Sequence, residues 1–162
     1  MSLLDDVSIV VTPNGYKAGT LYSVLPTAIA GSELVTNGDF SNGTTGWSSP
    51  VYNSTLSIDS GQMKIVSTLA LGRVSQAITT VVGKTYLINA TITNIDNSTG
   101  IQLKVSNASN LDGASYSSTF NTTTSPVTIT RAFEATATTT YIGSSQGSSV
   151  GQSALLDNVS VK

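Results

Sequence analysis

The chain has 162 residues, of which 39% are hydrophobic and only 10% are charged, and its formal net charge is −2 from 7 basic and 9 acidic residues. It contains no histidine and no cysteine, which excludes Ser-His-Asp and Cys-His nucleophile systems, zinc and haem sites built on those side chains, and disulfide scaffolds. So few basic residues cannot form a patch for a phosphate backbone, so we expect no nucleic-acid binding. The 25 serines and 24 threonines favour an all-β chain with many turns.

Residues 1–31 differ from the rest and predict an extended N-terminal arm. Two apolar runs, Ser8–Thr12 and Tyr16–Leu25, flank the turn signal at Pro13–Gly15, and the segment is too short for a core of its own. We expect it to dock on its own domain, a sister subunit or a larger partner, rather than to form a loosely ordered leader. The side chains that would anchor it are Ile9, Val10, Val11, Tyr16, Leu21, Tyr22 and Leu25.

The sequence carries no recognisable signal for export or membrane insertion. The segment Met1–Asp6 is acidic where a signal peptide needs positive charge. No apolar run approaches the roughly 18 residues of a membrane span. We therefore expect synthesis in a cytoplasm and no insertion into a membrane.

From Glu33 onward, short β runs alternate with glycine-containing turns such as Ser60-Gly61. Several runs alternate apolar and polar side chains with a period of two. About ten short strands at this spacing predict a jelly-roll β-sandwich over residues 32–162. The expected strands are Glu33–Thr36, Trp47–Tyr52, Thr55–Ile58, Gln62–Ser67, Gly72–Thr79, Thr85–Thr93, Gly100–Ser106, Ser115–Asn121, Val127–Ala135, Thr138–Ile142 and Ser153–Val161.

Three separated blocks carry a resemblance to a known family. They are Leu34–Trp47 (LVTNGDFSNGTTGW), Val74–Tyr86 (which begins VSQAI and ends GKTY) and Leu156–Val161 (LDNVSV). In this order they resemble the jelly-roll carbohydrate-binding modules of the family 4/9/22 type, over about residues 33–162. The resemblance implies the fold, and it implies that Phe40 and Trp47 are core residues.

The same resemblance implies sugar binding through exposed aromatic rings. The aromatic side chains assigned to the core are Phe40, Trp47, Tyr86 and Phe133. Those left to stack on a sugar are Tyr52, Tyr116, Phe120 and Tyr141. The alternative for these four rings is an ordinary role in cross-strand pairs.

Modules of this type often hold a structural Ca²⁺ between the first loop and the last strand. Here Asp157 matches the aspartate of the closing strand, and Asp39 lies in the first loop. Ser41 stands where the family usually has glutamate, and the loss of a carboxylate weakens an oxygen-ligand site. The alternative is that Asp39 caps its own turn and Asp157 meets backbone N–H groups, with no metal.

The arm carries a second resemblance. The segment Ser2–Pro26 is similar to the N-terminal segment of tailed-bacteriophage virion proteins, in which various β-domains follow the same leader. This resemblance implies a virion anchor, a location in the virion, other virion proteins as partners, and a homotrimer, because virion fibres are most often trimers.

The two resemblances together predict a non-enzymatic phage virion protein of the fibre or decoration type. Its sandwich would display a module for cell-surface glycans, with avidity from several copies. The alternative is a free carbohydrate-binding module of a bacterial surface or polysaccharide-degrading system. A glycan-cleaving enzyme is a third hypothesis, but nothing in the sequence marks the pair of carboxylates that it needs.

Overall fold

Alternating apolar and polar side chains along short strands place one apolar face on each of two sheets, and these faces pack together. The computed structural model describes residues 31–162, apart from 51–52, 97–98, 120 and 148. The predicted anchor residues of the arm lie outside the described residues. The described chain is all-β, as predicted. In this part of the chain no helix is long and apolar enough to cross a membrane.

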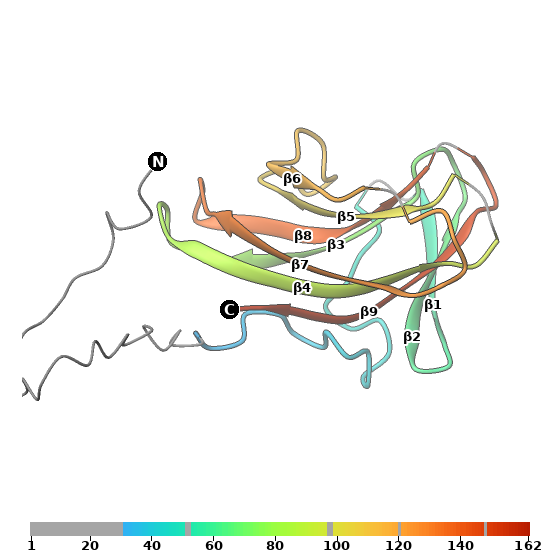
Figure 1. Ribbon diagram of the computed structural model, residues 1–162, viewed down its shortest axis with the longest axis horizontal. Coiled ribbons are helices and arrows are strands. Elements are labelled where there is room, and N and C mark those ends of the chain that lie inside the picture. Colours follow the sequence, from blue (N-terminus) through green and yellow to red (C-terminus); the bar gives the residue numbers. More distant parts are fainter. Residues whose placement is uncertain (1–30, 51–52, 97–98, 120, 148) are drawn as a thin grey trace, which may run out of the picture.

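The strands form a jelly-roll β-sandwich of two antiparallel layers, which confirms the predicted fold class (Figure 1). The five-stranded layer has the order β1 (Ser54–Asp59), β2 (Gln62–Ser67), β9 (Ser153–Val161), β4 (Thr85–Asn94) and β7 (Val127–Glu134). The four-stranded layer has the order β3 (Arg73–Thr79), β8 (Thr139–Gln146), β5 (Ile101–Ser106) and β6 (Tyr116–Ser117).

Three of the expected strands are shorter in the structure or absent, and the expected strand 138–142 continues to Gln146 as β8. Residues 33–36 form no strand, because the side-chain amide of Gln76 pairs with the backbone of Thr36 in place of a neighbouring strand. In the described part of 47–52, pairing is limited to one bridge between Ser48 and Ser75. The expected strand 115–121 shortens to β6, because the N–H of Leu103 donates to the Oγ of Ser118 rather than to a backbone carbonyl.

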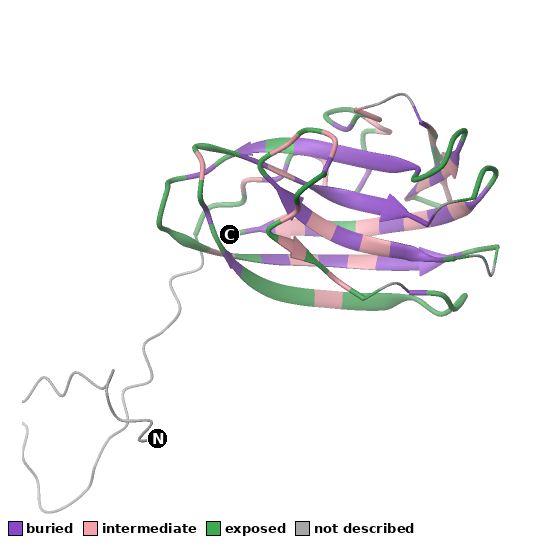
Figure 2. Cartoon of the chain, turned by 90° about the horizontal axis from the view of Figure 1, so that it is seen from above, coloured by how far each residue is buried: buried purple, intermediate pink, exposed green. Residues whose placement is uncertain are grey.

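The core fills the space between the two layers, and Figure 2 shows buried residues along the strands and exposed residues in the connecting loops. The first loop contributes its two aromatic residues to this core. Phe40 and Trp47 are 2% and 7% exposed, their ring centroids lie 5.4 Å apart, and the indole N–H of Trp47 donates to the carbonyl of Asn37 at 3.1 Å. The prediction that both are core residues is therefore confirmed.

The start of the described chain is fixed to the end of β9. The Glu33 carboxylate accepts hydrogen bonds from the Oγ of Ser160 (2.6 Å) and the N–H of Val161 (2.8 Å). At Gly38 any side chain is excluded, because a Cβ atom there would lie 1.9 Å from the carbonyl oxygen of Val159. The first loop and the last strand thus form one end of the sandwich.

Candidate functional site

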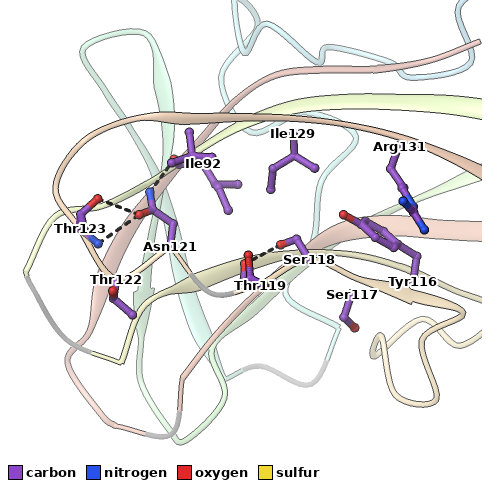
Figure 3. Close-up of a pocket in the computed structure, with 11 residues that line it drawn as sticks. Ile92, Tyr116, Ser117, Ser118, Thr119, Asn121, Thr122, Thr123, Ile129 and Arg131 are labelled. Atoms are coloured by element: carbon purple, nitrogen blue, oxygen red, sulfur yellow. Dashed lines mark hydrogen bonds between the residues drawn. The ribbon is translucent and has the colours of Figure 1, made fainter.

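A cleft of about 620 Å³ opens between the free edges of the two sheets (Figure 3). The edge strand of the five-stranded layer is β7, and the edge strand of the other layer is β6. Because β6 has only two residues, it leaves much of the inner face of β7 uncovered, and β7, the lowest strand in Figure 2, is mostly exposed. The lining residues are Ile92, Tyr116, Ser117, Ser118, Thr119, Asn121, Thr122, Thr123, Val127, Ile129 and Arg131.

The floor of the cleft is apolar and continues the core. Ile92 on β4 is fully buried, and Ile129 on β7 is half-buried and packs against the core. Tyr116 on β6 is the cross-strand partner of Val105, which points into the core, so its ring also faces the interior. The floor therefore offers an apolar surface and one aromatic ring.

Residues of both sheets meet at one end of the cleft. Arg131 extends from β7, and its guanidinium carbon lies 5.6 Å from the ring centroid of Tyr116 on β6 (Figure 3). A guanidinium group is attracted to the face of an aromatic ring at this distance. The contact thus fixes the position of a positive charge beside the aromatic ring.

Asn121 builds the other end of the cleft. This residue is buried, and its Nδ2 donates to the carbonyls of Ile92 (3.1 Å) and Ser125 (2.9 Å). Its Oδ1 accepts from the N–H and the Oγ1 of Thr123, at 3.1 and 3.0 Å. One side chain therefore holds the 121–125 turn against β4 and fixes the width of the cleft there.

Two hydroxyl groups along the cleft are available to a ligand. Thr119 and Thr122 are exposed, and their hydroxyls have no hydrogen bond within the part of the chain that the structure describes. In contrast, the Oγ of Ser118 donates to the carbonyl of Thr119 at 2.9 Å and is engaged in holding the wall. The cleft thus combines an apolar floor, an aromatic ring and unengaged hydroxyls.

Solved structures share this architecture. A carbohydrate-binding module of family 4 (CBM4) superposes with a TM-score of 0.60 at 18% identity, over 78% of this chain and 97% of that chain. The second module of family 16 gives 0.59 at 14% identity over 80% and 99%, and the CBM22-1 xylan-binding domain of Paenibacillus barcinonensis Xyn10C gives 0.57 at 18% identity over 82% and 95%. The fold is that of carbohydrate-binding modules. No family model matches the sequence, and no curated protein matches it.

The carbohydrate-binding-module fold separates the predicted stacking residues. Tyr116 lies in the cleft, whereas Tyr141 on β8 pairs with Ala77 and Ser106, next to the core residue Ile142. Because side chains alternate across a strand, Tyr141 lies on the outer face of the four-stranded layer. Tyr52 and Phe120 lie outside the described residues. The structure therefore does not bring Tyr116 and Tyr141 to one surface.

The two predicted calcium ligands have hydrogen-bond partners of their own. Both Ser41 donors, its N–H at 3.2 Å and its Oγ at 3.0 Å, reach the Oδ1 of Asp39, and these bonds hold the pKa of Asp39 below its ordinary value. Asp157 accepts from the N–H of Asn158 (2.8 Å) and the Nε2 of Gln62 (3.1 Å). These are the partners expected without a metal.

No group of three or more acidic, histidine or cysteine residues that could hold a metal occurs among the residues described. A structural calcium between Asp39 and Asp157 stays a prediction. Its check is the melting temperature in millimolar calcium and in chelator, for the wild type and Asp157→Asn. A bound ion raises the wild-type midpoint alone, by mass action, and superimposed wild-type curves would exclude it.

Arg131 is the site residue that the prediction of stacking aromatics missed. A signal for it exists in the sequence, because Val127, Ile129, Arg131 and Phe133 share the face of their strand that turns inward. A charged side chain among apolar ones on such a face is unusual, since Arg is rarely buried, and the structure leaves Arg131 exposed on the uncovered part of β7. Asn121 and the free hydroxyls had no comparable signal, because Ser and Thr occur throughout the chain.

Proposed function

We propose that the chain is a non-catalytic carbohydrate-binding module that holds a glycan in the cleft between β6 and β7. The observation that carries the proposal is the Tyr116 ring beside an apolar floor, flanked by the unengaged hydroxyls of Thr119 and Thr122. A sugar ring has apolar C–H faces and polar edges, so it needs an apolar surface together with a few placed polar groups. The carbohydrate-binding-module fold supports the same proposal.

The composition of the cleft supports binding rather than turnover. Glycoside hydrolysis uses two carboxyl groups on either side of the scissile bond. Of the cleft-lining residues that the structure describes, none is aspartate or glutamate. We therefore propose that the cleft binds and releases a glycan without cleaving it.

The test is affinity electrophoresis and calorimetry with a panel of neutral and acidic polysaccharides. We expect Tyr116→Ala to weaken binding at least tenfold, since stacking on one ring is worth about that factor. Tyr141→Ala is the matched control, because it removes the same kind of ring from the outer face of the same four-stranded layer. Melting curves of both variants separate lost binding from lost folding, and Thr119→Val and Thr122→Val probe the exposed rim without touching the core.

The opposite result has a clear meaning. If Tyr141→Ala abolishes binding while Tyr116→Ala binds normally, the glycan site is the outer face of the four-stranded layer and the cleft assignment is wrong. If no polysaccharide of the panel binds the folded wild type, the chain is not a glycan-binding module.

The virion context is a separate proposal. It rests on the resemblance of residues 2–26, and the solved structures that share the fold are carbohydrate-binding modules, so the free module has the broader support. Mass spectrometry of purified phage particles tests it, because a virion protein is present in many copies. A homotrimer and virion partners belong to this proposal, and sedimentation of the full chain tests the trimer.

A further inference from the structure

We infer that the cleft selects an acidic glycan, whose carboxylate or sulfate group pairs with Arg131. The inference rests on the proposed function, because it names the class of sugar that the cleft would bind. Among the described residues that line the cleft, Arg131 is the one charged side chain (Figure 3). A neutral glycan would offer this group hydroxyl acceptors only, whereas an anionic group also pairs with its charge.

The donors of Arg131 are free to meet an anion. Within the described residues both ion pairs lie elsewhere, between Lys64 and Asp59 and between Arg73 and Asp112. A guanidinium carries five N–H donors in a planar fork that matches a carboxylate or a sulfate. Its contact with the Tyr116 ring, at 5.6 Å from the centroid, is an attraction to the ring face and uses none of these hydrogen bonds.

The surroundings leave the cleft positive although the chain as a whole carries a formal charge of −2. The nearest acid along β7 is Glu134, which lies three residues further and therefore on the opposite face of the strand. Asp112 is engaged by Arg73 at 2.8 Å. A ligand in the cleft therefore meets one cation and no lining carboxylate.

Tyr116 and Arg131 also suit one ligand together. Because the guanidinium lies over one face of the Tyr116 ring, a uronate would place its C–H groups against the rest of that side chain and direct its carboxylate toward the guanidinium. Stacking and ion pairing then act on neighbouring parts of one sugar unit. The free hydroxyls of Thr119 and Thr122 lie further along the cleft for the next units.

A charge that points inward on an edge strand can also serve to prevent pairing with another chain. That role predicts a different result for an Arg131→Gln variant than anion binding does. If Arg131 only protects the edge of β7, Arg131→Gln associates with itself at high concentration and binds every glycan as the wild type does. Sedimentation of the variant therefore accompanies the binding measurements.

The experiment compares polysaccharides that share a backbone and differ in whether their acidic groups are present and charged. Polygalacturonate and its full methyl ester share a backbone, as do a sulfated galactan and its desulfated form. We expect the wild type to bind an acidic form about tenfold more tightly than its neutral counterpart, the factor that a charge-assisted hydrogen bond provides, and to lose this preference in high salt. Arg131→Gln should remove the preference, and Lys84→Gln, which removes an equal charge from an exposed loop, should keep it.

The outcomes distinguish the inference from the proposed function. If neutral glycans bind as tightly as acidic ones and binding still needs Tyr116, the module stands and the role of Arg131 is wrong. If Arg131→Gln keeps the acidic preference, the inference is equally overturned. A preference for polygalacturonate alone identifies the carboxylate, and a preference for both acidic forms identifies a general anion site.

Discussion

Single side chains replace missing backbone pairing at the end of the sandwich. The Gln76 amide donates to the carbonyl of Thr36 and accepts from its N–H, both at 2.8 Å, so it satisfies both backbone groups of that residue. Glu33 does the same for the N–H groups of Val35 and Val161. The side chain of Gln76 is buried, and a buried side-chain amide without hydrogen-bond partners would be costly. Its pairing with the backbone of Thr36 explains why glutamine rather than an apolar residue occupies position 76.

Trp47→Ala is expected to destabilise the fold by roughly 3–5 kcal/mol, the usual cost of truncating a buried large aromatic residue. The indole contacts Phe40 and its N–H donates to the carbonyl of Asn37, so the change leaves a cavity and removes one of the two hydrogen bonds to that carbonyl. Urea unfolding measures the loss, and Trp47→Phe should recover part of it. An unchanged stability together with lost glycan binding would show that Trp47 contacts the ligand instead.

Glu33 makes stability depend on pH. Partial burial raises the pKa of this carboxyl, but hydrogen bonds from Ser160, Val161 and Val35 outweigh that effect, and the pKa lies below its ordinary value. A lowered pKa in the folded state means that the carboxylate stabilises the fold above the unfolded pKa, near 4.5, and that this stabilisation disappears as the pH falls through the folded pKa.

We therefore expect Glu33→Gln to be less stable than the wild type near pH 7 and to approach it near pH 3. Urea unfolding across this range measures the difference. A gap that stays constant with pH would show that the hydrogen bonds of Glu33 do not depend on its charge.

At the scale of elements, the alternation of apolar and polar side chains along the sequence predicts most of the strands. Strands 62–67 and 153–161 were predictable to the residue, because turn residues bound runs of regular alternation. The strand at 115–121 was not, because its length depends on Ser118, whose Oγ replaces a backbone carbonyl as the acceptor for Leu103. The alternation of apolar and polar residues does not reveal this replacement of a backbone acceptor by the Ser118 side chain, although the replacement shortens β6 and so opens the cleft.

Ser118→Ala should restore no strand and should destabilise the cleft wall. The N–H of Leu103 would lose its acceptor, which costs about 1–3 kcal/mol for a buried donor. Amide hydrogen exchange at Leu103 should accelerate, whereas Ser117→Ala, on an exposed side chain, should leave it unchanged. Equal exchange in both variants would show that Ser118 does not fix the end of β6.

The candidate site was less predictable than the fold. An aromatic role for Tyr116 could be proposed from the sequence, but its separation from Tyr141 depends on which way each strand turns its alternating face. Arg131 becomes significant only once β7 is known to be an edge strand opposite a short β6. The alternation of residues 127–133 marks Arg131 as unusual, but the cleft itself is a consequence of where two sheets end, and alternation does not show that.

For the whole molecule, the contacts predict that the sandwich folds without the arm. The core residues and the Glu33 hydrogen bonds all lie within 33–162. Deleting residues 1–31 should therefore leave the melting temperature nearly unchanged, as measured by circular dichroism. Under the virion proposal the same deletion prevents incorporation into particles, and truncated protein found on virions would refute the anchor role of Ile9 to Leu25.

The junction between residues 31–38 and β9 has a mechanical consequence. Leu34 donates to the carbonyl of Val161 and Val159 donates to the carbonyl of Gly38, so the two segments run antiparallel and both leave the sandwich at the end where Gly31 lies against Lys162. A pulling force applied between these two points acts across the hydrogen bonds and peels them apart one after another, beginning with the outermost. Tension on the chain would therefore release the Glu33 end first, at low force, while the cleft between β6 and β7 keeps its shape.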